Sequence, residues 1–148
     1  RPPLRDESDR VRLVEGLVDG TISAVCSNHQ PVDANAKSAP FSLTQPGAST
    51  IEHILPLIMH IKKLGSELSL KESISLVTSK PASILGIEKG MLKENGDADI
   101  CIFDPNKNTD INKSNLLSAG KNTPFGGWEL DGKVTHTILG GKLVFNSD

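Results

Sequence analysis

The chain has 148 residues, of which 36% are hydrophobic and 3% aromatic, and its formal net charge is −2. With no basic stripe, the sequence offers nucleic acid no electrostatic surface, and its longest purely apolar run, residues 54–59, is far shorter than the roughly 20 residues that cross a membrane. The length suits about one average domain, and the sparse apolar content predicts a modest core or a piece of a larger protein.

Two further features bear on origin and compartment. Cys26 and Cys101 lie in apolar, strand-like runs, which predicts free buried thiols rather than a disulfide and favours a cytoplasmic protein. The first five residues, RPPLR, resemble neither an initiator methionine nor a signal peptide. We expect them to be an internal point of a longer polypeptide.

Residues 6–27 read as a helix followed by a strand. Asp6 is placed to cap a helix ending near Val18, because an Asp side chain accepts a hydrogen bond from a free N–H of the first turn. Asp19-Gly20 ends this helix, and the apolar run 21–27 predicts a strand of a parallel sheet buried on both faces. One helix face is apolar through Val11, Val14, Leu17 and Val18.

A long polar loop, residues 28–45, follows this strand, and long loops in compact domains are usually functional or disordered. Ser49 or Thr50 is then expected to cap a helix that Gly65 ends, with Glu52 in its first turn and Pro56 kinking its interior. Its predicted buried face consists of Ile51, Ile54, Leu55, Ile58 and Ile61.

The next segment is helical and the last is rich in strands. A capping box, Ser69 to Glu72, opens a helix with Leu70, Ile74 and Val77 inward, and a short turn, 81–85, ends at Gly86. From Ile87 onward we expect short strands at 90–93 and 99–104, a turn at Asp131-Gly132, and a hairpin of 133–139 and 142–145 around Gly140-Gly141. A helical turn is expected at 113–118. The sequence therefore divides into an α/β part, 1–86, and a mainly β part, 87–148.

The four histidines are the local candidates for chemistry. His29 follows Asn28 at the expected carboxyl end of a strand, where it suits either a metal ligand or acid–base group or a hydrogen bond that orders the loop. His53 and His60 are seven residues apart on one helix, which exceeds the spacing that lets two ligands share a metal ion, so a structural role is favoured. His136 is expected to face solvent. Trp128 beside Phe125 is expected to be packing.

Read as a whole, the chain resembles the C-terminal third of a dihydroorotase of the amidohydrolase superfamily. The resemblance covers essentially all residues and rests on motifs in the family's order: PPLR at 2–5, DGTI at 19–22, SNHQPVD at 27–33 where the family carries T-D-H-A-P-H, PG at 46–47 with Glu52 and LPL at 55–57, KPASILG at 80–86, ADI at 98–100, KNTPF with Gly127-Trp128, and GGK at 140–142.

This resemblance implies a fold and a chemistry. The family fold is a metal-dependent (β/α)₈ TIM-type barrel with a small β-sandwich made by both chain ends, so 1–86 corresponds to the last part of the barrel and 87–148 to C-terminal strands of the sandwich. Dihydroorotases interconvert N-carbamoyl-L-aspartate and dihydroorotate. A zinc centre polarises the amide carbonyl and activates water, while an Asp at the end of the last barrel strand is a ligand and proton shuttle.

The resemblance also identifies degenerate positions. Asn28 stands where the family has the catalytic and metal-binding Asp, and an amide neither accepts a proton near neutral pH nor binds Zn²⁺ well. Val32 stands in place of the substrate-contacting His. Pro46 and Gly47 retain the segment where the family binds substrate through its backbone. The family's other metal ligands lie upstream of Arg1.

Two hypotheses follow. The first is a catalytically degenerate, oligomeric dihydroorotase-like protein of pyrimidine biosynthesis, with zinc absent or incomplete. By resemblance to non-catalytic relatives in some bacteria, its partners are the rest of the dihydroorotase-like chain and aspartate carbamoyltransferase. The alternative is an active zinc dihydroorotase whose site tolerates Asn28. Neither reading involves nucleic acid or a membrane.

Overall fold

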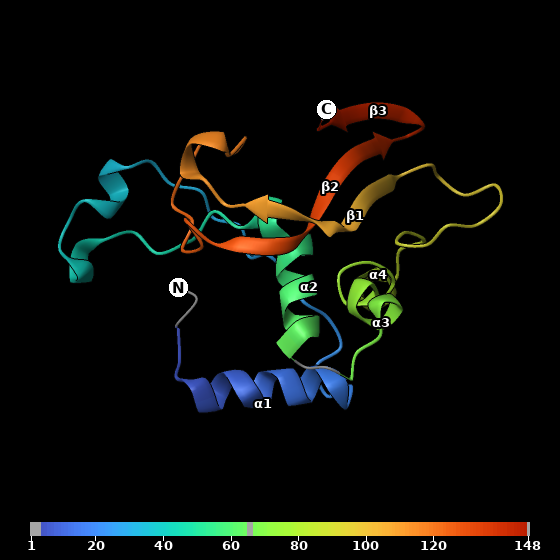
Figure 1. Cartoon of the computed structure of the whole chain (residues 1–148), viewed down its shortest axis with the longest axis horizontal. Coiled ribbons are helices and arrows are strands. Elements are labelled where there is room, and N and C mark those ends of the chain that lie inside the picture. Colours follow the sequence, from blue (N-terminus) through green and yellow to red (C-terminus); the bar gives the residue numbers. More distant parts are fainter. Residues whose placement is uncertain (1–3, 65–66, 148) are drawn as a thin grey trace.

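The computed structural model describes residues 4–64 and 67–147. The predicted helix end at Gly65 and the first three residues of the RPPLR segment lie outside these ranges. Helix α2 (Ile54–Leu64) lies between helix α1 (Glu7–Val18) and a three-stranded sheet, and the short helices α3 (Leu70–Ser75) and α4 (Ser79–Leu85) lie beside it (Figure 1). Strands β1 (Ile100–Asp110), β2 (Glu129–Leu139) and β3 (Lys142–Asn146) form the sheet.

Helix α1 forms where its capping residue predicts. The Asp6 carboxylate accepts a hydrogen bond from the N–H of Asp9, so the helix begins at Glu7 and ends at Val18. Gly20 then takes a left-handed φ of 82°, which reverses the chain at little steric cost. The predicted helix and its end are confirmed.

The predicted strand 21–27 is wrong. These residues join no ladder, and the nearest pairing is an isolated parallel bridge between His29 and Ala48. A strand requires a neighbouring edge, and the N–H of Val25 instead donates to the carbonyl of Leu76, at the end of helix α3 (2.9 Å). The segment is therefore a linker that packs on helices, and the expected burial on both faces is absent as well.

Helix α2 begins later than predicted. Residues 51–53 form a 3₁₀ turn, so Pro56 falls in the first turn of the α-helix, where its missing N–H is tolerated, and not in the interior as predicted. Ile58 is buried, with 1% of its surface exposed, whereas Ile51, predicted to be inward, is 54% exposed because it precedes the helix.

The capping box of helix α3 is confirmed: the Ser69 hydroxyl accepts from the N–H of Glu72, and the Glu72 carboxylate accepts from the N–H of Ser69. Because this helix has only six residues, its buried positions are Ser73 and the capping residue Leu76, not Leu70, which is exposed. Leu76, Leu68 and Leu17 form a small apolar core.

The C-terminal sheet is antiparallel in the order β1-β2-β3, and the hairpin at Gly140-Gly141 is confirmed. Residues 90–93 form no strand. Asp131-Gly132 is not a turn between strands but lies inside β2, where the pairing register with β1 shifts. The expected helical turn is present as a 3₁₀ turn, Lys113–Asn115.

Both cysteines are exposed in the structure, so their predicted burial is wrong. Cys26 lies in the unpaired linker, and Cys101 lies on β1, an edge strand of the sheet. Many large apolar side chains are exposed as well, including Leu143 and Val144 of the other edge strand. Among the described residues, no helix is long and apolar enough to cross a membrane.

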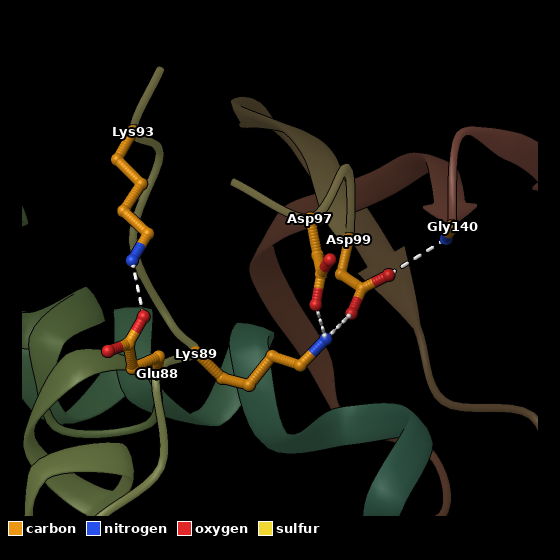
Figure 2. Close-up of polar contacts among 6 residues, drawn as sticks. All are labelled: Glu88, Lys89, Lys93, Asp97, Asp99 and Gly140. Atoms are coloured by element: carbon orange, nitrogen blue, oxygen red, sulfur yellow. Dashed lines mark hydrogen bonds and ion pairs between the residues drawn. The ribbon is translucent and has the colours of Figure 1, made fainter. Parts of the chain in front are cut away.

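An ion-pair network joins the segment after α4 to the sheet (Figure 2). Lys89 Nζ lies 2.5 Å from a carboxylate oxygen of Asp97 and 2.7 Å from one of Asp99, and the other oxygen of Asp99 accepts from the N–H of Gly140 (2.8 Å). The hydrogen bond to Asp97, then that to Asp99, raises the pKa of Lys89. The network fixes the chain just beyond Ile87, where a domain boundary remains a prediction.

Candidate functional site

Three segments distant in sequence meet at the candidate site: residues 27–33, 45–52 and 116–123. The N–H of Gln30 donates to the carbonyl of Ala48 (2.9 Å), which joins the first two segments next to the His29–Ala48 bridge. Further hydrogen bonds between side chains and the backbone connect these segments. The sequence predicts two of these segments as site residues, and the structure brings them together.

Asn28 occupies the position of greatest chemical interest. Its φ of 42° is left-handed, a conformation that asparagine adopts more easily than most residues. Its side chain is exposed, and its carbonyl oxygen lies 3.5 Å from Nε2 of Gln30. A carboxamide at this place accepts a hydrogen bond and does not take up a proton near neutral pH.

His29 makes hydrogen bonds that order the loop, which is the role predicted for it as the alternative to a metal ligand or acid–base group. Its Nδ1 accepts hydrogen bonds from the N–H groups of Thr50 (3.1 Å) and Ile51 (3.2 Å), which begin the 3₁₀ turn. Because Nδ1 accepts, it carries no proton in this arrangement. Thr50 is not the side-chain cap that the sequence predicts, since its hydroxyl donates to the carbonyl of Ser27 (2.6 Å).

Val32 and Gly47 are held by one side chain. The N–H of Val32 donates to Oδ1 of Asn122 (2.9 Å), and Nδ2 of Asn122 donates to the carbonyl of Gly47 (3.2 Å). The Val32 side chain itself is half-buried and offers no hydrogen bond. Pro46 is exposed and precedes Gly47, whose carbonyl also accepts from Nζ of Lys37 (2.9 Å).

Gly47 is required by both conformation and space. Its φ is 114°, which L side chains rarely adopt, and a Cβ there would lie 2.7 Å from Cβ of Gln30. The loop therefore approaches the residues after His29 more closely than any side chain at position 47 would permit.

Two contacts of the candidate site are not predictable from the sequence. Glu52 was expected to favour a helix N-terminus, but its carboxylate accepts from the N–H groups of Leu117 (2.8 Å) and Ser118 (2.7 Å). The sequence identifies Asn122 only as part of the KNTPF segment. Its position in that motif was the available signal, but no spacing rule connects residue 122 with residues 30–47.

The other histidines differ in environment. His53 is 4% exposed and its Nδ1 has no hydrogen-bond partner; burial lowers its pKa, and the nearby charge of Glu52 opposes this in part. The rings of His60 and Trp128 pack in a T-shaped arrangement, and Trp128 also contacts Phe125, so the expected packing role of Trp128 is confirmed. His136 is half-buried rather than solvent-facing, with its ring nitrogen 3.0 Å from the hydroxyl of Thr135.

A cavity of about 730 Å³ adjoins the site. Apolar side chains of α1 and α2 line part of it, and Ser27, Gly47 and Asn122 of the loops also line it. Across residues 4–64 and 67–147, no three His, Cys, Asp or Glu side chains gather in a way that could hold a metal ion.

Comparisons with known proteins show the family to which this chain belongs. A model of the Amidohydrolase family matches residues 45–145, and the chain belongs to this family. It is 38% identical over 148 residues to the dihydroorotase of Bacillus thuringiensis (strain Al Hakam), an alignment that covers 99% of this chain and 34% of that protein. The chain is thus dihydroorotase-like, and it spans about a third of the length of the curated relatives that it matches.

Solved structures of similar fold include hydantoinases. The D-hydantoinase (dihydropyrimidinase) from Thermus sp. superposes with a TM-score of 0.88 at 25% identity, and the L-hydantoinase (dihydropyrimidinase) from Arthrobacter aurescens with 0.85 at 31%. Each match covers 98% of this chain and 33% of the other. This likeness is consistent with a portion of a TIM-type barrel fold, although the strands observed here form a three-stranded antiparallel sheet.

Amidohydrolase family members typically use metal ions. The side chains that the structure describes do not by themselves form a site for a metal ion. At the expected ligand position, the only oxygen that Asn28 offers is an amide carbonyl, which faces the amide of Gln30, and amide oxygen is a poor ligand for zinc.

Proposed function

We propose that this chain is part of a dihydroorotase-like protein of pyrimidine biosynthesis that has lost turnover. The observation that carries the proposal is Asn28. The resemblance places an acid–base and metal-binding carboxylate there, and Asn28 supplies an uncharged amide on a loop that is otherwise well ordered by hydrogen bonds. At Val32 the imidazole expected to contact substrate is replaced by an alkyl group, so two polar functions are missing from one loop.

The rest of the site supports loss of chemistry rather than loss of structure. Gly47 keeps the close approach to Gln30, and His29 keeps its bonds to the start of the following turn. Such a retained scaffold suits a structural role. We propose that the whole protein is cytoplasmic and oligomeric and acts as a partner of aspartate carbamoyltransferase, with residues 1–86 as the last part of a TIM-type barrel and 87–148 as strands of a small β-sandwich.

The alternative is an active zinc dihydroorotase, and the identity to proteins named dihydroorotase favours it. In that case Asn28 would bind the metal through its carbonyl oxygen, and another base would carry the proton. We regard this as the second candidate, because Asn28 cannot serve as the proton shuttle and the amide oxygen of Asn is a weak zinc ligand.

The experiment compares four versions of the full-length protein: wild type, Asn28→Asp, Val32→His and the double variant. Each is assayed for interconversion of N-carbamoyl-L-aspartate and dihydroorotate with added zinc, and its bound zinc is measured. Degeneracy predicts no turnover in the wild type and none in Asn28→Asp, because Val32 still lacks the substrate contact. Turnover by the wild type with bound zinc would favour the alternative.

The proposed partnership has its own test. Full-length protein is mixed with aspartate carbamoyltransferase from the same organism and separated by size-exclusion chromatography. Co-elution at a defined stoichiometry is expected, and it should persist in Asn28→Asp because the assembly does not depend on the site. Separate elution of the two proteins at micromolar concentrations would contradict the scaffold role.

A further inference from the structure

The carboxamide of Asn122 joins the two loops of the candidate site. Its Oδ1 accepts from the N–H of Val32 (2.9 Å), and its Nδ2 donates to the carbonyls of Gln30 (3.1 Å) and Gly47 (3.2 Å). The orientation of the amide follows from its partners, since the oxygen faces an N–H and the nitrogen faces two carbonyl oxygens. One side chain thus satisfies three backbone groups from two segments that are about fifteen residues apart.

The segment that carries Asn122 is itself fixed. It belongs to the connection between β1 and β2, residues 111–128, which Figure 1 shows in orange alongside the loops of the N-terminal half. The Glu52 carboxylate binds the N–H groups of Leu117 and Ser118 in this connection. At Gly120, a Cβ would lie 2.6 Å from the backbone nitrogen of Val32, so the connection and the loop are in close contact.

We propose that Asn122 is a positioning residue that fixes the separation of the Gln30–Val32 segment from Gly47. The C-terminal part of the chain therefore completes a site whose other residues come from the N-terminal half. This inference goes beyond the proposed function, because the arrangement holds whether or not the site turns over substrate. The proposed role requires a side chain that carries both a donor and an acceptor at the correct length. Aspartate lacks the donor, alanine lacks both groups, and glutamine is one methylene too long.

The reporters of this role are two backbone amides. The Val32 amide bonds to Asn122 directly. The Gln30 amide does not: it donates to Ala48 and so reports whether the two loops stay together. Hydrogen exchange of both amides is measured by NMR on the full chain, together with the midpoint of urea unfolding. Asn112→Ala is the matched control, because Asn112 lies in the same connection but caps only its own turn at Ser114.

In Asn122→Ala, exchange at both amides is expected to accelerate about two- to tenfold, the effect of losing roughly one net hydrogen bond. Asn112→Ala should leave both rates unchanged. In Asn122→Asp, the carboxylate still accepts from Val32 but faces two carbonyl oxygens, so only the Gln30 amide should accelerate.

The proposal is overturned if Gln30 exchanges at the wild-type rate in Asn122→Ala, since the loops would then stay together without the carboxamide. If Asn122→Ala loses protection throughout the chain, Asn122→Asp decides: a split between Val32 and Gln30 supports positioning, and equal behaviour of the two amides refutes it.

Discussion

Gly47→Ala is expected to be strongly destabilising, because two independent penalties coincide at this residue. A left-handed φ costs an L residue about 1–2 kcal/mol, and inserting a methyl group into a packed region costs about 1–3 kcal/mol. Gly47 has a φ of 114°, and its Cβ would lie 2.7 Å from Cβ and 2.9 Å from the carbonyl oxygen of Gln30. The expected loss in the free energy of unfolding is about 2–5 kcal/mol.

Two other glycines separate these penalties. Gly20 has a φ of 82° with nothing within 4 Å of its Cβ, so Gly20→Ala carries the conformational penalty alone. Gly120 has no left-handed φ, but its Cβ would lie 2.6 Å from Val32, so Gly120→Ala carries the steric penalty alone. Urea unfolding of the three variants gives the comparison. A loss in Gly47→Ala no greater than that in Gly20→Ala would refute the close approach of the two loops.

Three further outcomes are expected. Burial lowers the pKa of His53 below its ordinary value of 6.5, so the unfolded chain binds the proton more readily and the free energy of unfolding falls as the pH drops below 6.5. His53→Gln should make the slope of this free energy between pH 7 and pH 5 shallower, and an unchanged slope would contradict the expectation. Ile58→Ala should lower the free energy of unfolding by about 2–5 kcal/mol and Ile51→Ala by less than about 0.5 kcal/mol, since Ile58 is buried and Ile51 is exposed. Equal losses of the two variants in urea unfolding would contradict the position of helix α2. Lys89→Met should lower the free energy of unfolding slightly, and its difference from the wild type should shrink in 1 M salt, because the ion pairs of Lys89 with two aspartates are exposed. A difference that does not change with salt would show that the ion pairs are not its cause.

Local rules were sufficient where an element is determined by its own residues. Asp6 begins helix α1, Ser69 and Glu72 form a capping box, and Gly140-Gly141 closes a hairpin, because each depends on hydrogen bonds within a few residues. The same rules failed at residues 21–27. There the apolar run has the composition of a strand, but strand formation depends on a partner edge that the run itself does not determine.

The candidate site was predictable in part. The resemblance identified Asn28, Val32 and Gly47, and the structure places their segments together. The resemblance gave no indication of the long-range contacts of Glu52 and Asn122, because each side chain bonds to backbone groups more than 60 residues away. Sequence patterns report periodicity and capping, and they contain no information on which distant backbone N–H a carboxylate or amide will reach.

The central proposal is that turnover has been lost because Asn28 stands in place of a carboxylate and Val32 in place of an imidazole. The most direct measurement is the rate of interconversion of N-carbamoyl-L-aspartate and dihydroorotate by the wild-type full-length protein, with its bound zinc determined on the same sample. The account predicts no rate above the uncatalysed background, even with zinc added. A measurable rate in a protein that retains zinc would contradict it.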